Sequence, residues 1–507
     1  MKAASPSTSP KPTAMSTPFA TLPVETIVDI LRFCSAECSP VMLPTPPTFA
    51  ETCRTIAGAD LSTLSQVCRG FATVIRDTPS LWSTITIDLR CFTHISADDP
   101  YHGNKNQAYR ADYNVIINLV RRVLELGKDT PITINFVQAR DLYPIQLLEL
   151  VAQSAGRWRD ATFYIHPVML HGLFAVHGNL HRLENLTIVR CLGDVEDLAS
   201  SLERPLSWFS VAPRLTQVNF PGPLRVGLLH IPVEQLEHLQ CSPQYADIPA
   251  FLQIATRMGP GSQLNVELHV DWFEDDISNA VHLEGQHFQQ RVDSALQNLR
   301  ITAVHDQSPD YIACSDGSAV GFLLQSLRLP NLDSFELIAA PQTPVPLVWP
   351  QDAALGFFGS SSGKNLTTLM LQDVRLSPQQ LLAVLHCLPI LQDLSFADFV
   401  GDDPDDGDDI PALFTDELLH ALSQPQGQLV PRLARLMVTS KAAFAEPVLS
   451  RFIMQRLRPG QVFTFTLLWV PSFASMFEAE LDYAIERWVE AGLLCWESRD
   501  FPSYARD

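Results

Sequence analysis

The chain has 507 residues, 46% of them hydrophobic, and a mean hydropathy of +0.07, so it can bury a large core. Its formal net charge of −21, from 35 basic and 56 acidic residues, argues against nucleic-acid binding, because phosphate contacts need clustered Lys and Arg. No apolar run approaches the roughly 18 residues of a membrane-spanning helix, which argues against a membrane partner.

Residues 1–20 are rich in Ser, Thr and Pro and lack the apolar stretch of a signal peptide, so we expect a disordered tail there. The 10 cysteines are scattered singly, which indicates a reducing location, cytoplasmic or nuclear. Cys34 and Cys38 have the spacing of one ligand pair, but no second close pair follows at a suitable distance. A structural zinc site is therefore not expected.

Two segments near the N-terminus carry apolar residues at helical spacing. Val24, Ile27, Val28 and Leu31 follow Pro23, which fits the first turn of a helix without losing a needed donor. A second run from residue 64 places its apolar residues on one helix face, namely Leu64, Val67, Cys68, Phe71 and Ile75. The two helices are expected to share an apolar seam.

The order of these residues carries a family resemblance. A leucine–proline pair, spaced Ile and Leu, Val-Cys-Arg-x-Phe and a final Leu-Trp occur as Leu22, Pro23, Ile27, Ile30, Leu31, Val67, Cys68, Arg69, Phe71, Ile75, Leu81 and Trp82. Residues 21–82 thereby resemble the F-box, the helical module that docks on the Skp adaptor of SCF ubiquitin ligases. The ending at residues 76–82 is similar to the form found in mushroom-type fungal F-box proteins.

The resemblance implies a Skp-family adaptor as partner, held by apolar side chains of the module. The implied docking residues are Leu22, Pro23, Ile27, Ile30, Leu31, Val67, Cys68, Phe71, Ile75 and Trp82. Some of them must instead form the core of the module, and the sequence does not divide the two groups. Residues 35–59 contain Pro40, Pro44, Pro46 and Pro47 and are expected to be a loop outside the fold.

Residues 83–507 repeat the frame L-x-x-L-x-L, with other apolar residues allowed. It occurs at Leu183-Leu186-Ile188, Leu215-Val218-Phe220, Leu236-Leu239-Cys241, Leu296-Leu299-Ile301, Leu332-Phe335-Leu337, Leu366-Leu369-Leu371, Leu391-Leu394-Phe396 and Leu433-Leu436-Val438. Less regular strands are expected at 85–89, 132–136, 161–165, 264–270 and 462–468.

The frame resembles the strand half of a leucine-rich repeat, whose leucines point into a shared core while the residues between them line an exposed face. The expected fold class is α/β: a short N-terminal helical F-box-like module followed by an irregular leucine-rich-repeat-like solenoid. The intervals between frames vary widely, so a non-solenoid α/β domain with leucine-rich buried strands is the alternative.

Amphipathic helices are expected at 113–126, 378–388 and 476–491, the last as a cap on the stacked core.

If the repeats are real, the partner faces the strand positions between the leucines, for example His181, Asn185, Thr187, Gln217, Asn219, Thr367, Thr368, Met370 and Gln372. The acidic stretch 401–409 is expected to be a solvated loop, because Pro404 and Leu413 stand where a calcium-binding loop needs ligands.

Gly359, Ser361 and Gly363 match G-x-S-x-G, the motif that presents the nucleophile of serine hydrolases after a strand and before a helix. Here a helix is expected at 353–358 and a strand at 366–371, which reverses that order. The segment is therefore expected to be a loop. No catalytic residue, cofactor or metal site is predicted.

These observations predict a substrate-recognition adaptor of an SCF-type ubiquitin ligase rather than an enzyme. It would dock on the Skp adaptor through the F-box-like module and bind an unknown protein substrate with the repeat domain. The alternative is a leucine-rich-repeat interaction scaffold whose N-terminal helices only cap the solenoid. A third hypothesis, a hydrolase using Ser361, predicts labelling by a fluorophosphonate probe.

Overall fold

The structure is a computed structural model that describes residues 22–500 apart from internal segments 37–46, 57–58, 93–102, 140–143, 191–206, 224–229, 244–247, 270–290, 305–317, 340–346, 398–411, 425–428, 441–443, 459 and 470–478. The predicted tail at 1–20, the acidic stretch at 401–409 and Cys38 lie outside the described residues. Contacts between Cα atoms divide the chain into two compact units. They are Met1–Leu183 with Cys191–Asp197, and Glu184–Arg190 with Leu198–Asp507.

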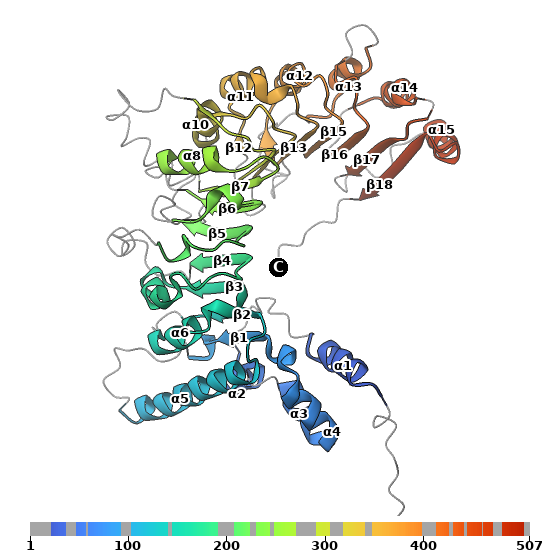
Figure 1. Cartoon of the computed structure of the whole chain (residues 1–507). Coiled ribbons are helices and arrows are strands. Elements are labelled where there is room, and N and C mark those ends of the chain that lie inside the picture. Colours follow the sequence, from blue (N-terminus) through green and yellow to red (C-terminus); the bar gives the residue numbers. More distant parts are fainter. Residues whose placement is uncertain are drawn as a thin grey trace, which may run out of the picture. The chain divides into compact units, whose positions relative to one another are not determined.

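The first unit begins with helices and continues with a small parallel sheet. The helices are α1 (Val24–Ala36), α2 (Phe49–Ile56), α3 (Ala59–Val67), α4 (Arg69–Asp77) and the 3-10 helix η2 (Pro79–Trp82). The strands, in sheet order, are β1 (Thr84–Asp88), β2 (Ile132–Val137) and β3 (Trp158–Ile165). Between and after them lie η3 (Arg90–Phe92), α5 (Gly103–Leu126), α6 (Ile145–Ala152), η4 (Ala155–Arg157) and η5 (Pro167–Val176) (Figure 1).

Alternation of side chains explains why these strands form a sheet. Ile85 and Ile87 of β1 are at most 1% exposed, and Ile132, Ile134 and Phe136 of β2 are fully buried. The residues between them are half-buried, so each strand turns one row of β-branched or aromatic side chains inward. Helix α5 connects β1 to β2 and α6 connects β2 to β3, as parallel pairing requires.

The second unit contains one long parallel sheet. Its strands, in both chain and sheet order, are β4 (Asn185–Arg190), β5 (Gln217–Pro223), β6 (His238–Ser242), β7 (Gln263–His269), β9 (Asn298–Val304), β11 (Ser334–Ala339), β13 (Thr368–Gln372), β15 (Asp393–Ala397), β16 (Arg435–Ser440), β17 (Phe463–Trp469) and β18 (Leu494–Asp500). Two minor parallel pairs join β8 (Val292–Asp293) to β10 (Leu327–Arg328) and β12 (Leu347–Val348) to β14 (Val374–Arg375).

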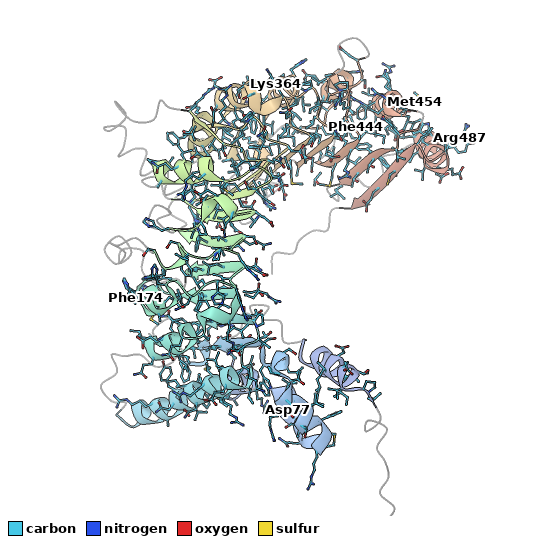
Figure 2. All side chains as sticks on the ribbon, in the orientation of Figure 1. Asp77, Phe174, Lys364, Phe444, Met454 and Arg487 are labelled. Atoms are coloured by element: carbon cyan, nitrogen blue, oxygen red, sulfur yellow. The ribbon has the colours of Figure 1, made fainter. Side chains whose placement is uncertain are left out.

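Helices lie on one side of this sheet (Figure 1). They are α8 (Ile248–Arg257), α10 (Ser318–Ser326), α11 (Gln351–Phe358), α12 (Pro378–Leu385), α13 (Asp416–Leu422), α14 (Glu446–Arg456) and α15 (Ala479–Glu490), with the 3-10 turns η7 (Ser207–Phe209), η9 (Val233–Gln235) and η11 (Ser361–Gly363). Figure 2 shows side chains filling the space between these helices and the strands, with Met454 of α14 at the outer surface. Among the described residues, no helix is both long and apolar enough to cross a bilayer.

Every predicted L-x-x-L-x-L frame coincides with a strand of the second unit. The strand begins two residues after the first leucine, as Thr368 of β13 follows Leu366. In most frames the backbone N–H of that leucine donates to the carbonyl three residues earlier, which closes a turn; Leu433 donates to Val430 at 3.1 Å. The first leucines are all at most 6% exposed. Each frame therefore belongs to a strand whose apolar row is buried, and in most frames a closed turn precedes the strand.

The strand positions between the leucines form the less buried face of the sheet. Asn185, Thr187, Gln217, Asn219, Thr368, Met370 and Gln372 are half-buried or exposed, and His181 and Thr367 precede their strands. Because the strands pair in parallel register, these side chains stand in rows. Asn219 donates to the Thr187 hydroxyl at 3.4 Å, and Arg300 lies 3.5 Å from the neighbouring Glu336.

The expectation of a loop at 35–59 is wrong in part. Helix α1 continues to Ala36, and Phe49–Ile56 forms α2, which contacts β1 and α5. Thr48 supplies the start of α2: its hydroxyl accepts from the Glu51 N–H at 3.3 Å, and the Glu51 carboxylate accepts from the Thr48 N–H at 2.7 Å. This reciprocal pair satisfies donors at the helix N-terminus, which the prolines upstream do not prevent.

The single helix expected from residue 64 is in fact two helices. Cys68 separates α3 from α4 and has an extended backbone, with φ −156° and ψ 160°. Its sulfur accepts a hydrogen bond from the Phe71 N–H at 3.4 Å and so caps α4. The apolar spacing continues across the break because both helices bury one side. The helices expected at 113–126, 378–388 and 476–491 are confirmed as α5, α12 and α15, with shifted ends.

Candidate docking module

Half of the predicted docking residues are buried in the core of the N-terminal module. Ile27, Leu31, Phe71, Ile75 and Trp82 are all at most 9% exposed. The Trp82 indole N–H donates to the Ile75 carbonyl at 2.9 Å, which satisfies the one polar atom of that ring inside the core. These side chains are buried within the first unit rather than exposed on its surface.

The remaining apolar positions lie at the surface of α1 and α3. Val67 is 64% exposed and Ile30 is 37% exposed, while Pro23 is exposed and Leu22 is half-buried. Val24 is 54% exposed, although the helical spacing assigned it to the shared seam. We call the four exposed residues, Pro23, Val24, Ile30 and Val67, the exposed apolar set. Aliphatic side chains gain free energy when a partner removes them from water, so this set can anchor a partner.

Cys68, the remaining predicted docking residue, is half-buried and caps helix α4. Its position between α3 and α4 fixes where the first helix ends and the second begins. Val67 is the residue just before this break, so its exposure follows from the chain leaving α3 there. The structure thus gives Cys68 a capping role and Val67 a surface position.

The module is attached to the sheet of its own unit through α2. The Thr52 hydroxyl donates to the Asp88 carbonyl at 2.8 Å, and the rings of Phe49 and Phe92 meet edge to face at 6.0 Å. Asp88 also holds Arg90 in an ion pair at 2.6 Å. Thr52 was not recognised as a structural residue from the sequence. The Thr48-x-x-Glu51 capping pattern is typical of a helix N-terminus and could have predicted helix α2, which contains Thr52.

A cavity of about 270 Å³ lies between the module and α5. Apolar side chains from α3, α4 and η2 meet those of α5 there, including Leu61, Ile75 and Leu119. Arg76 and Arg122 also line it. The cavity borders the core of the module and lies beside buried Ile75 and Trp82, apart from the exposed apolar set.

The serine-rich segment has the helix–loop–strand order expected from the sequence, because α11 precedes η11 and β13 follows it. The Ser362 hydroxyl is buried and accepts from the Leu329 N–H at 2.9 Å, while the Ser361 hydroxyl accepts from Arg328 at 3.1 Å. These bonds tie the loop to the preceding repeat. Within the described part of the chain, no group of three or more His, Cys, Asp and Glu side chains is placed to hold a metal ion.

Comparison with known proteins supports the identity of the module. Residues 19–88 match the F-box-like family, so the chain carries an F-box-like domain there. No curated protein matches the chain. Among solved structures, a chain of the yeast Rad7 and Elc1 complex is similar over 85% of this chain and 100% of its own length, with 14% sequence identity and a TM-score of 0.28. A TM-score this low does not establish a common fold.

Proposed function

We propose that this chain is the substrate-recognition adaptor of an SCF-type ubiquitin ligase and docks on a Skp-family adaptor through its F-box-like domain. The single observation that carries the proposal is the exposed apolar set on α1 and α3 of that domain. Val24 and Val67 are more than half exposed in a module that already has a complete core. Burying such side chains against a partner contributes up to about 1.5–3 kcal/mol each, less the cost of association.

The ten docking residues predicted from the sequence then act in two ways. Leu22, Pro23, Ile30 and Val67 touch the Skp adaptor directly, together with Val24, which the prediction omitted. Ile27, Leu31, Phe71, Ile75 and Trp82 hold the helices in place from the core, and Cys68 caps α4. The ligase chemistry belongs to other subunits, so the chain is a binding protein and not an enzyme.

The second unit is proposed to be the substrate-binding part, a leucine-rich-repeat-like solenoid. Its support is the coincidence of each frame with a parallel strand, and the helices on one side of the sheet. A single strand–helix repeat cannot bury its own apolar row, but neighbouring repeats bury each other's. The less buried face of the sheet, with rows such as Asn185, Gln217 and Thr368, is the surface we assign to a protein substrate.

The docking experiment compares purified full-length variants in a pull-down with a purified Skp-family adaptor. Ile30→Asp with Val67→Asp places charge in the proposed contact, and we expect binding to weaken by about a hundredfold or more. Val211→Asp is the matched control, because Val211 is 53% exposed but belongs to the second unit. Binding by the control and not by the double variant supports the docking role; equal binding by both contradicts it.

The second candidate function is an interaction scaffold without a ligase, in which the module only caps the sheet. The contacts of α2 with β1 and α5, including the bond from Thr52 to Asp88, favour this alternative. The same pull-down separates the two functions. A folded wild-type chain that does not bind the Skp adaptor would leave the scaffold as the better proposal.

A further inference from the structure

A basic cavity lies at the start of strands β16 and β17 in the second unit. Its volume is about 550 Å³, and Arg432, Arg456 and Arg458 all line it. Gln392 and Gln461 also line it. The chain as a whole carries a formal net charge of −21, so three arginines that line one cavity are a local concentration of positive charge in an acidic chain.

Arg456, the last residue of α14, is fixed at the base of this cavity. Arg456 is only 9% exposed. Its guanidinium group donates to the carbonyls of Val430 at 2.9 Å, Leu422 at 2.6 Å and Leu429 at 3.1 Å. A guanidinium has five N–H donors, so these bonds hold it in place without using all of them. The side chain also lies over the ring of Phe452, with the guanidinium carbon 5.7 Å from the ring centre.

The charged Arg456 side chain donates these hydrogen bonds to neutral backbone carbonyls. Burial, and then repulsion from Arg458, lowers the pKa of Arg456 to about 10, so the side chain is still protonated at neutral pH. An anion bound in the cavity would offset this unfavourable environment of the Arg456 charge.

Two turns bring the other arginines to the rim. The Gln461 N–H donates to the Arg458 carbonyl at 3.1 Å, and Gly460 has a φ of +80°, which favours glycine. Arg432 lies in the turn that precedes β16 and is exposed. Asp393, next to Gln392 in the chain, lies 3.7 Å from Arg435.

We propose that this cavity binds a phosphate group carried by a larger ligand. The positive charge of three lining arginines matches the double negative charge of a phosphate monoester better than the single charge of a carboxylate, and the planar donors of arginine suit phosphate oxygens. The cavity is within the range of about 300–1,000 Å³ that ligand sites occupy, so it has room for the body that bears the phosphate. The site belongs to the second unit and does not rest on docking by the F-box-like domain.

The test is isothermal titration calorimetry of the full chain in phosphate-free buffer at low salt. The probes are N-acetyl-phosphoserine amide, pyrophosphate and N-acetyl-aspartate amide. We expect at least one phosphate probe to bind more tightly than the aspartate compound. The phosphoserine compound binding more tightly than pyrophosphate indicates a phosphorylated protein side chain as the source of the phosphate; the opposite order indicates a small free polyphosphate.

The variants are chosen from exposed arginines so that folding is preserved. Arg432→Gln with Arg458→Gln removes two rim charges, and we expect the dissociation constant of the better phosphate probe to rise about tenfold or more. Arg451→Gln is the control, because Arg451 is exposed on the same helix α14 but does not line the cavity. The proposal is overturned by any of three results: no phosphate probe binds, the aspartate compound binds equally well, or the double variant binds as the wild type does.

Discussion

The F-box-like domain and the repeats of the second unit use apolar residues of similar spacing in different ways. In the L-x-x-L-x-L frames, the first leucine is always at most 6% exposed, because each strand has paired neighbours and a helical layer over it. In the domain, Val67 is 64% exposed while Phe71, one helical turn later in the sequence, is 7% exposed. Periodicity thus locates the core where neighbouring strands and helices cover each strand. In the small helical domain, it does not separate core residues from surface residues.

The largest expected effect is on a buried ring of the repeats. Phe335 of β11 is fully buried, and its ring lies 5.2 Å from that of Phe358 and 5.9 Å from that of Phe357. Phe335→Ala should lower the free energy of opening of the surrounding strands by about 3–5 kcal/mol. Amide hydrogen exchange of β9, β11 and β13 measures this. Glu336→Ala is the control, since Glu336 shares only a partly exposed ion pair with Arg300 and should cost under about 1 kcal/mol.

A second substitution tests whether the domain has the division between core and surface described above. Ile75 is 3% exposed and accepts the Trp82 indole bond through its carbonyl. Ile75→Ala should lower the free energy of opening of α4 and η2 by about 2–5 kcal/mol, whereas Val67→Ala should change it by less than about 0.5 kcal/mol. Hydrogen exchange of these helices measures both. Similar losses in the two variants would mean that Val67 belongs to the core.

The smallest effect concerns the break between α3 and α4. Cys68→Ala removes the acceptor of the Phe71 N–H and should cost about 0.5–2 kcal/mol of local stability. Cys68→Ser keeps an acceptor at the same place and is expected to be at least as stable as the wild type, because serine is a preferred capping residue. Faster exchange of the Phe71 amide in the alanine variant alone is the expected result. Equal exchange in both variants would show that the sulfur does not cap α4.

The strands of the second unit were predictable from sequence because their determinants are local. The frame of Leu433, Leu436 and Val438 contains its own period of two, and the turn before it is closed by the Leu433 N–H donating to the Val430 carbonyl at 3.1 Å. Helix α12 begins at Pro378 behind Ser377, and its capping box with Gln380 is formed entirely by near neighbours. Such elements need no knowledge of distant contacts.

The features missed in the F-box-like domain depend on contacts remote in sequence. Helix α2 is stabilised by Thr52 bonding to Asp88 and by Phe49 packing on Phe92, and neither partner could be identified from the segment itself. Val24 and Val67 are more than half exposed although both share the helical spacing of buried residues. The resemblance identified the domain, but only the packing divided its residues between interior and surface.

The hydrogen bond from Thr52 to Asp88 has a mechanical consequence. Helix α2 contacts α3 on one side and β1 on the other, so packed side chains connect the helices of the F-box-like domain to the first strand. A partner bound to α1 and α3 would therefore constrain the direction in which β1 runs. In such an arrangement the short helix α2 transmits orientation from the bound surface to the sheet, and the bond from Thr52 to Asp88 is one of the contacts through which it does so.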